Sequence, residues 1–504
     1  MPACITLPFK FRKNDPDVPK ITRTKAASRT DRQTKNLTAS RIFARLSHKV
    51  LHNYYMTMNG KLQNGFAMHS GAFVLKTHSP ADVAHTLIDS GRQKEPFYVF
   101  DMDEAHRRIQ HFKSQMPRVQ IFYAMKANDS EYMLKLAITS GLGFDCASPG
   151  EIYNLRQLNV NAKSIIYAMP SKTAEQMIYA RDSGVLHTTF DSSYELKKIK
   201  QYWPDARLLV RIRVEGKSVY NLGDKFGCGH DTEAIKLLDE AAALSLKVVG
   251  VAFHVGSGCS SIDSHENGLR YAKALFEHEA RAGRQMKIVD IGGGFLSDKT
   301  DRIDQVANII NKALEEYFPD KSVQVIAEPG RYICDSSYTL YCSINNVRQV
   351  IKDKEVVNMI YLNDGLYGTL RYNESWHKVK RYRVSTDEES LEKAILWGPS
   401  CDSTDRIMEN FTILLPQCTP SDWLVLPIQG AYSFGFATNF SCLPTPRTRI
   451  VISTELWYKL KESKVFKASD FVVNPDINEP LPTTIPKVIT ENITTDVKSP
   501  FLLA

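Results

Sequence analysis

Short apolar runs alternate with longer helix-like segments through the middle of the chain, and this alternation limits the folds that the chain can adopt. Each run has the length of one β-strand, and each intervening segment has room for a helix. Strands that alternate with helices predict a parallel sheet with helical crossover connections. The runs are Phe97–Phe100, Gln120–Ala124, Gly143–Cys146, Ser164–Tyr167, Thr188–Phe190, Leu208–Val214, Val248–His254, Lys287–Gly292 and Gln324–Glu328.

About eight such units between residues 96 and 335 match a (β/α)8 barrel, in which each unit supplies one strand and one helix. A doubly wound sheet is the alternative, because periodicity alone cannot show that a sheet closes on itself. The expected fold class is therefore α/β, with the barrel at 96–335.

A second, β-rich domain is expected over residues 336–470. The helix-like segments cease near residue 335, and the segment 66–95 is expected to contribute to this second domain. The Pro- and Thr-rich residues 471–504 are expected to form a flexible tail. The strand-like runs of the second domain are Thr339–Val350, Asn358–Leu362, Ala394–Leu396 and Trp423–Pro427.

The positive charge of the chain is concentrated at its N-terminal end. The formal net charge is +8, yet residues 1–70 alone hold 13 Lys and Arg against three Asp, a net of +10. The rest of the chain is therefore close to neutral, at about −2, and the basic balance does not indicate nucleic-acid binding. Residues 1–65 lack sustained periodicity, which predicts a basic disordered arm, although Arg41–Met58 could form one helix.

Nine scattered cysteines include no C-x-x-C pair. This pattern indicates neither a disulfide framework nor a zinc site, and no metal is expected. It is typical of a reducing compartment, so a cytoplasmic location is expected, with a mitochondrial leader in the basic arm as the alternative. The chain has no stretch of 18 uncharged apolar residues, so no membrane span is expected.

Lys126 ends an apolar, strand-like run that begins at Phe122. A strand holds the stem of such a lysine rigid, and the chemistry of barrel enzymes takes place at the carboxyl ends of the strands. This placement suits a lysine that forms a Schiff base with a carbonyl compound. An ordinary strand-end lysine is the alternative when this motif is taken alone.

Gly292, Gly293 and Gly294 follow the apolar strand Ile288–Ile291. Bare glycine backbone lets amide N–H groups close around an anion, and the late loops of a barrel often bind phosphate. Arg331 is a natural second contact for a phosphate group. A tight strand-to-helix turn is the alternative, and the spacing does not match the dinucleotide-binding fingerprint.

Four motifs follow Lys126 along the chain. They are His254-Val255-Gly256-Ser257-Gly258, Gly292-Gly293-Gly294-Phe295, Glu328-Pro329-Gly330-Arg331-Tyr332 and Gly398-Pro399-Ser400-Cys401-Asp402. Together with the lysine motif they resemble the eukaryotic ornithine decarboxylase family, pyridoxal 5'-phosphate (PLP) enzymes built on an alanine-racemase-like barrel. The resemblance covers roughly residues 70–460.

The resemblance implies a PLP site in which Lys126 binds the cofactor covalently. It places Glu328 beside the pyridine nitrogen, where a carboxylate keeps the nitrogen protonated and the ring strongly electron-withdrawing. It also implies that His254 stacks against the ring. Further contacts with the cofactor or its lysine are implied for Asp145, Glu151, Arg211, Ser257, Gly292, Gly293, Gly294, Arg331 and Tyr432.

The resemblance further implies a homodimer with two shared active sites. Cys401, in a loop that reaches the partner's site, would deliver a proton to the substrate Cα, and thiols are good proton donors near neutral pH. Asp364 and Asp402 would hold the distal amine of the substrate. Lys225 and Asp405 would form a salt bridge across the dimer interface.

The expected activity is the decarboxylation of L-ornithine to putrescine and CO₂, a step of polyamine synthesis. The alternatives are a decarboxylase of lysine, arginine or diaminopimelate on the same scaffold, and a plain racemase, which Glu328 disfavours. A non-catalytic regulator that binds an antizyme-like protein is a further alternative, which the intact Lys126, Asp145, Glu328 and Cys401 disfavour.

Three segments depart from the family pattern. Ala127 stands where a cysteine is usual, and Gly430–Phe436 is bulkier than the run of small residues expected there. Phe440–Leu443 replaces an F-N-G-F motif near the substrate site. The last change leaves the preferred substrate length and the catalytic rate open.

Overall fold

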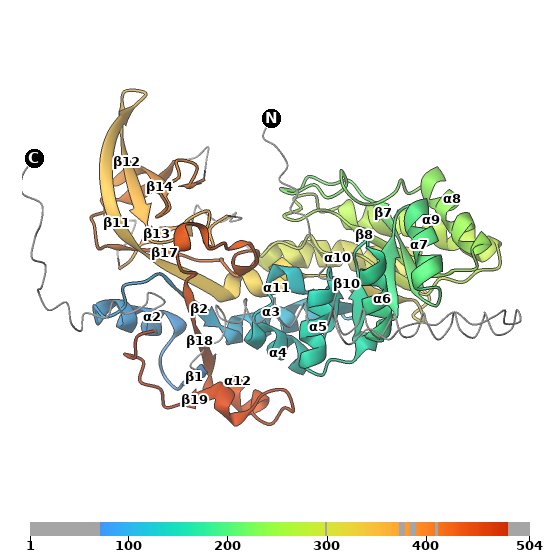
Figure 1. The fold of residues 1–504 in the computed structure, drawn as a ribbon, viewed down its shortest axis with the longest axis horizontal. Helices are drawn as coiled ribbons and strands as arrows, with labels where there is room; N and C mark the ends of the chain where they lie inside the picture. Colours follow the sequence, from blue (N-terminus) through green and yellow to red (C-terminus); the bar gives the residue numbers. More distant parts are fainter. Residues whose placement is uncertain (1–70, 298–299, 372–377, 384–389, 409–411, 482–504) are drawn as a thin grey trace, which may run out of the picture. The chain divides into compact units, whose positions relative to one another are not determined.

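The computed structural model describes residues 71–297, 300–371, 378–383, 390–408 and 412–481, and these include a closed barrel of eight parallel strands (Figure 1). In chain order the barrel strands are β3 (Val119–Ala124), β4 (Gly143–Cys146), β5 (Ile165–Tyr167), β6 (His187–Phe190), β7 (Arg207–Arg213), β8 (Lys247–His254), β9 (Ile288–Asp290) and β10 (Gln324–Ala327). They pair in the order β10-β3-β4-β5-β6-β7-β8-β9. Closure confirms the (β/α)8 prediction and excludes the doubly wound alternative.

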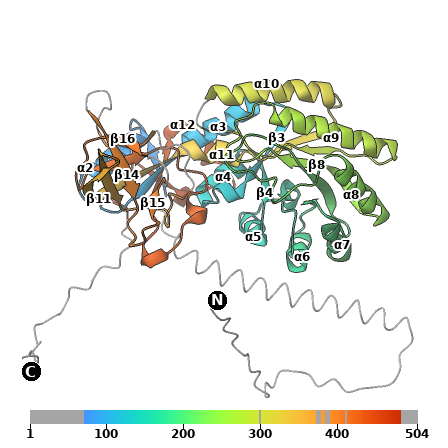
Figure 2. The same ribbon diagram turned by 90° about the horizontal axis from the view of Figure 1, so that it is seen from above.

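Helices cover the outside of this barrel, as seen from above in Figure 2. Ser148 and Thr173 show how two of them begin, because each side chain accepts a hydrogen bond from a first-turn backbone N–H. The helices are α3 (Met102–Gln115), α4 (Glu131–Thr139), α5 (Pro149–Gln157), α6 (Ala174–Asp182), α7 (Ser193–Tyr202), α8 (Thr232–Ala243), α9 (Ser264–Arg281) and α10 (Thr300–Tyr317).

The barrel strands are apolar along most of their length because they are covered on both faces. Strand β7, for example, buries five consecutive residues between an exposed residue at each end. Such a strand packs against the barrel interior on one side and the helices on the other. This double burial explains why continuous apolar runs, rather than an alternating pattern, identified the strands.

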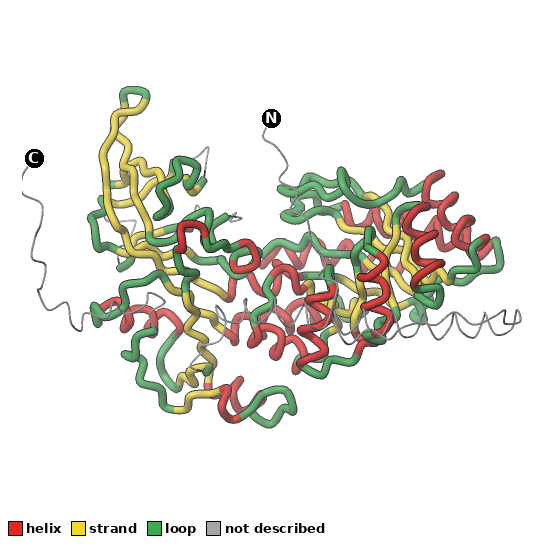
Figure 3. Tube along the Cα trace, in the orientation of Figure 1, coloured by secondary structure: helices red, strands yellow, loops and turns green. Residues whose placement is uncertain are grey.

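The second domain is built on a mixed sheet of 11 strands, which confirms a separate β-rich domain. Figure 3 shows this strand-rich part beside the helix-rich barrel. Three further helices are α2 (Pro80–Asp89), α11 (Gly330–Cys334) and α12 (Thr454–Leu460). The strands are β1 (Ala72–Leu75), β2 (Phe97–Asp101), β11 (Tyr338–Lys352), β12 (Glu355–Leu362), β13 (Lys380–Arg381), β14 (Leu391–Trp397), β15 (Arg406–Ile407), β16 (Ile413–Pro416), β17 (Trp423–Leu426), β18 (Arg447–Ser453) and β19 (Phe471–Val473).

The prediction that the run Phe97–Phe100 belongs to the barrel is wrong. Strand β2 lies in the second sheet, where it pairs with β18 in parallel and with β11 in antiparallel orientation. Four of its five residues are buried, as in a barrel strand, so its apolar pattern cannot tell one sheet from the other. The barrel therefore begins with β3, and α3 is the segment that leads into it.

The ends of the chain also differ from the expected boundaries. Strand β19 lies within the expected flexible tail, yet it pairs with β1, and Leu481 is buried against the same sheet's core. Residues 482–504, the expected arm 1–65 and the candidate helix Arg41–Met58 lie outside the described residues. Within the described ranges, no helix is both long and apolar enough to cross a membrane.

Candidate active site

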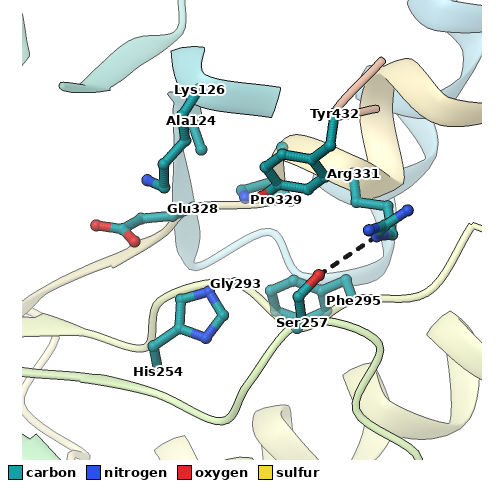
Figure 4. Close-up of a pocket in the computed structure, with 12 residues that line it drawn as sticks. Ala124, Lys126, His254, Ser257, Gly293, Phe295, Glu328, Pro329, Arg331 and Tyr432 are labelled. Atoms are coloured by element: carbon teal, nitrogen blue, oxygen red, sulfur yellow. Dashed lines mark hydrogen bonds between the residues drawn. The ribbon is translucent and has the colours of Figure 1, made fainter. Parts of the chain in front are cut away.

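A pocket opens at the carboxyl end of the barrel strands, where barrel enzymes carry their chemistry. It holds about 320 Å³ of empty space, including solvent at its mouth. Figure 4 shows how residues at or just after the ends of β3, β8, β9, β10 and β17 converge on it. The lining residues are Ala124, Lys126, His254, Ser257, Gly293, Gly294, Phe295, Glu328, Pro329, Gly330, Arg331 and Tyr432.

Most of the predicted cofactor residues therefore meet in one place, although they are spread over some 300 residues of sequence. The remaining ones support those that line the pocket. Asp145 pairs with Lys126, and the carbonyl of Gly292 accepts a 2.7 Å hydrogen bond from the Glu328 N–H. Arg211 is buried in β7, and its charge acts on the pKa values of both His254 and Glu328.

Lys126 projects into the pocket from a short 3₁₀ turn, Met125–Ala127, that directly follows β3. Its Nζ forms an ion pair with Oδ2 of Asp145, a fully buried residue on the neighbouring strand β4. Burial by itself would lower the pKa of Lys126, but the carboxylates of Asp145 and Glu328 raise it above its ordinary value. The amine is thus held as an ammonium paired with the Asp145 carboxylate.

Glu328 follows β10 and is 5% exposed. Its burial, together with the nearby charges of Asp145 and Asp290, raises the pKa of this carboxyl well above its ordinary value. Lys126 and Arg211 act in the opposite direction. Glu328 therefore holds a proton more readily than an ordinary glutamate and can share it with a basic atom in the pocket.

Asp290 is a functional candidate that the sequence analysis missed. It ends β9, and its Oδ1 accepts a 2.9 Å hydrogen bond from the Gly292 N–H, which fixes the start of the glycine loop. Burial raises the pKa of Asp290 to about 6. The available signal was an acidic residue ending an otherwise apolar strand, two positions before the first glycine.

His254 is a neutral imidazole whose ring faces the pocket (Figure 4). Burial and the neighbouring cations Arg211 and Lys126 lower the pKa of His254 well below its ordinary value. Its Nδ1 accepts a 3.0 Å hydrogen bond from the Gly256 N–H, so the proton of the neutral ring lies on Nε2. A neutral, fixed ring is suited to stacking against a flat ligand.

The other end of the pocket is rich in hydrogen-bond donors. Arg331 Nε donates to Ser257 Oγ at 3.4 Å, the dashed contact in Figure 4, and its guanidinium lies 5.0 Å from the centre of the Tyr432 ring. Among the described residues, the N–H groups of Gly293 and Gly294 have no acceptor. Unused amides beside an arginine and a serine form a site for an anion.

The glycines of this loop are required by its geometry. Gly292 and Gly294 have φ values of 63° and 100°, in the left-handed region that favours glycine. A Cβ on Gly292 would lie 2.2 Å from the Phe253 carbonyl oxygen, and one on Gly294 would lie 2.5 Å from Val255 Cγ2. Side chains at these positions would therefore push the loop out of the donor-rich end.

Glu151 does not line the pocket. It lies in α5, and its Oε2 accepts a 2.5 Å hydrogen bond from the Ala147 N–H in the loop that follows β4. Burial raises the pKa of Glu151 to about 7. Its visible role is to hold the loop that follows Asp145, and its predicted contact with the cofactor stays a prediction.

Cys401 and Asp402 lie in the loop between β14 and β15 and do not line the pocket of their own chain. Cys401 is exposed, and Asp402 Oδ2 accepts a 2.5 Å hydrogen bond from the Tyr367 hydroxyl. This hydrogen bond lowers the pKa of Asp402, which therefore remains charged. The prediction that these residues serve a partner subunit's site stays a prediction.

Asp364 is buried and hydrogen-bonded within its own chain. Asp364 is 4% exposed, and its Oδ2 accepts a hydrogen bond from the Thr369 hydroxyl, which in turn accepts from Tyr98 at 2.6 Å. Burial raises the pKa of Asp364 to about 6. The carboxylate is thus enclosed within its own chain, and its contact with a substrate amine stays a prediction.

Asp405 is likewise occupied within its own chain. It is 1% exposed, and its two oxygens accept backbone hydrogen bonds from Leu366 at 2.8 Å and Ser400 at 3.0 Å. Lys225, its predicted partner across a dimer interface, is exposed. Asp405 therefore shapes the loop that carries Cys401, and its ion pair with Lys225 of a second copy stays a prediction.

The bulky segment Gly430–Phe436 does not fill the pocket. Phe434 packs into the second domain, with its ring centre 4.6 Å from that of Tyr98. Phe440, in the other divergent segment, stacks on Tyr367 at 4.3 Å, so it lies beside the hydrogen-bond partner of Asp402. Phe440 thus lies at the loop of Asp402, whereas Tyr432 of the segment Gly430–Phe436 lines the Lys126 pocket.

Comparison with known proteins agrees with this geometry. A family model described as the pyridoxal-binding domain of pyridoxal-dependent decarboxylases matches residues 102–335. Ornithine decarboxylase 2 of Drosophila melanogaster is 36% identical over 357 residues, which cover 70% of this chain and 90% of that protein. Antizyme inhibitor 2 of Xenopus laevis is 36% identical over 369 residues, which cover 70% of this chain and 80% of that protein.

The fold is also shared with a solved structure. The arginine decarboxylase of Paramecium bursaria Chlorella virus, bound to agmatine, superposes with a TM-score of 0.69 and 31% sequence identity. The match covers 74% of this chain and all of that chain. The match is longer than the barrel alone, so it extends beyond the barrel.

Proposed function

The chain belongs to the ornithine decarboxylase family of pyridoxal-dependent decarboxylases, and from this premise we propose that it converts L-ornithine into putrescine and CO₂. The observation that carries the proposal is a pocket with a lysine held between buried acids at one end and anion-binding donors at the other. Its cofactor is PLP.

The residues of the pocket fit this cofactor. Asp145 Oδ1 is a buried oxygen without a hydrogen-bond partner among the described residues, and Glu328 is an acid whose proton a pyridine nitrogen can take up. Ser257, Arg331 and the free amides of the glycine loop would hold the phosphate. His254 would contact the face of the ring.

PLP, when bound, supplies an electron-withdrawing ring that takes up the electron pair left at the substrate Cα when CO₂ departs. Lys126 would hold the cofactor covalently and release it to the amine of the substrate. Glu328 would keep the ring nitrogen protonated, which strengthens electron withdrawal and favours decarboxylation over racemisation. Cys401 of a second copy would deliver the proton to Cα.

Substrate choice rests on the charged loop that carries Asp402. A carboxylate held in one orientation by Tyr367 is complementary to the distal ammonium of a dibasic amino acid. The short side chain of Asp402 favours ornithine over longer substrates, provided that the loop between β14 and β15 keeps its position. A relative that acts on arginine shares the fold, so arginine and lysine are the rivals to measure.

Release of CO₂ from ornithine, lysine, arginine and diaminopimelate, with PLP added, tests the proposal. We expect kcat/KM for ornithine to exceed that for each competitor by about tenfold or more, because one or two extra methylene groups misplace the distal charge. A faster reaction with lysine or arginine would reassign the substrate, and no release from any of the four would refute the activity.

Asp402→Asn should raise KM for ornithine by about tenfold or more, because a hydrogen bond to a charged group contributes about 1.5–3 kcal/mol. The affinity for PLP should not change, since Asp402 would contact the distal ammonium of the substrate and not the cofactor. Asp205→Asn, an exposed position between α7 and β7, is the matched control. An equal loss of cofactor affinity in Asp402→Asn would contradict a role limited to the substrate.

A homodimer with shared sites follows if Cys401 serves the pocket of a partner. Lys126→Ala and Cys401→Ala, each inactive alone, should recover about one quarter of the activity when mixed in equal amounts. Random exchange makes about half of the dimers mixed, and each mixed dimer has one intact site out of two. Mass spectrometry of the dimers would show exchange, and exchange without recovered activity would contradict shared sites.

A regulator that binds an antizyme-like protein is the second candidate, because a relative named antizyme inhibitor matches the chain. The presence of Lys126, Asp145, Glu328 and Cys401 supports catalysis instead. The catalytic and the binding roles predict different results in cells. If Lys126→Ala preserved the whole effect of the protein on cellular putrescine, binding rather than catalysis would explain the function of the protein. We also propose that the protein is cytoplasmic.

A further inference from the structure

The glycine loop is fixed from behind by a histidine that the proposed function does not use. His265 lies in the first turn of α9, is 2% exposed, and its Nε2 is 3.1 Å from the carbonyl oxygen of Gly293. Its ring also stacks on Phe295, the residue after the glycines, with ring centres 4.8 Å apart. One side chain therefore contacts the loop at two successive points.

The hydrogen bond has a defined direction. A carbonyl oxygen can only accept, so Nε2 of His265 must carry the proton and donate it. Burial lowers the pKa of His265 to about 4, so the ring is neutral at neutral pH and Nδ1 carries no proton. Nδ1 has no hydrogen-bond partner within the described ranges, so the contact with Gly293 is the polar anchor of this ring.

The direction of the Gly293 carbonyl sets the direction of the next amide. In a planar trans peptide the C=O of one residue and the N–H of the next point to opposite sides. Because the Gly293 carbonyl points toward His265 and α9, the Gly294 N–H points away from α9. Gly294 also lines the donor-rich end of the pocket, together with Ser257 and Arg331.

The loop borders a second, small cavity on its opposite side. This cavity is lined by Gly294, Phe295 and His265, together with Cys259 and Ile303. Gly294 and Phe295 thus form a wall between this cavity and the cofactor pocket. Without a contact from α9, the wall could turn its amide away from the pocket.

We propose that His265 is a positioning residue for the phosphate of the cofactor: by holding the Gly293 carbonyl and the Phe295 ring, it keeps the Gly294 amide directed into the anion site. The inference rests on the proposed placement of the phosphate at the glycine loop. It predicts a specific signature, because loss of His265 should weaken the binding of ligands that carry the phosphate and spare those that lack it.

The test compares the affinities of the full-length protein for PLP and for pyridoxal, which lacks the phosphate. His265→Phe keeps an aromatic ring against Phe295 and removes the donor. We expect it to weaken PLP binding by about tenfold, the size of one well-placed hydrogen bond, and to change pyridoxal binding by less than about twofold. Visible absorbance of the bound cofactor gives both affinities without any substrate.

A matched pair separates the hydrogen bond from packing. His265→Gln and His265→Met have side chains of similar size, but only glutamine offers an N–H donor. Glutamine should therefore retain more PLP affinity than methionine, and the phosphorus NMR signal of bound PLP should shift in the methionine variant. If His265→Phe does not fold, the comparison of His265→Gln with His265→Met still tests the role of the hydrogen bond.

Equal losses of PLP and pyridoxal affinity would show a general structural role and overturn the proposal, as would unchanged binding of both ligands. The result is independent of the substrate proposal. A protein that decarboxylates lysine, or none of the tested amino acids, would still show a phosphate-specific loss in the His265 variants if this inference holds.

Discussion

Lys126→Ala should abolish decarboxylation, with a loss of activity on the order of 10³-fold or more, the scale seen when a covalent catalytic group is removed. The reason lies in the position of the amine. Lys126 is the lysine that lines the pocket in the described part of the chain, and its Nζ forms an ion pair with Asp145 while the charge of Glu328 also raises its pKa. The variant should also lose the visible absorbance of the covalently bound cofactor.

The fold should survive this change, because the side chain of Lys126 is 37% exposed in the pocket and contributes little to the core. The main cost to stability is that the buried carboxylate of Asp145 loses its ion-pair partner. Lys247→Ala is the control: Lys247 is exposed at the start of β8, at the opposite end of the barrel. Turnover by Lys126→Ala near that of the control would refute the assignment.

Glu328→Gln should lower kcat for ornithine by about 10²- to 10³-fold, the usual effect of removing one preorganised electrostatic group from an active site. Glutamine has nearly the same shape but cannot donate a proton to a ring nitrogen or balance its charge. Electron withdrawal from Cα would therefore weaken. PLP should still bind, because Lys126 and the anion site are unchanged.

The same substitution should leave the protein as stable as before, or more stable. Burial and the charges of Asp145 and Asp290 raise the pKa of Glu328, so a neutral side chain relieves repulsion among three buried acids. Thermal unfolding would measure this. Glu175→Gln, on the exposed surface of α6, is the control. Undiminished kcat in Glu328→Gln, with PLP bound, would show that this carboxyl does not tune the ring.

Sequence patterns predicted the barrel because burial on both faces makes its strands continuous apolar runs, as in β7. The same property caused the error at β2, whose equally buried residues belong to the second sheet. The apolar pattern of a segment indicates that the segment is buried. The sheet that it joins depends on pairing with strands that are distant in the sequence. The pairing of β19 with β1 was missed for the same reason, since these strands lie about 400 residues apart.

The candidate site was predictable where its residues lie in short motifs, and less so elsewhere. Lys126, Glu328 and the glycine loop follow strands directly, so the topology of a barrel brings them together. His265 acts from a helix, and its contact with Gly293 has no local sequence signal. The surroundings of Asp364 were not predictable, because an aspartate in a turn can face solvent or, as here, be enclosed by Thr369 and Tyr98.

The most direct test of the central claim is to locate the cofactor on the chain. Reconstitution of the full-length protein with PLP, reduction with borohydride and peptide mapping by mass spectrometry would identify the modified residue. The account predicts stoichiometric modification at Lys126 and visible absorbance before reduction. A protein that stays colourless, or carries the cofactor on another lysine, would contradict it.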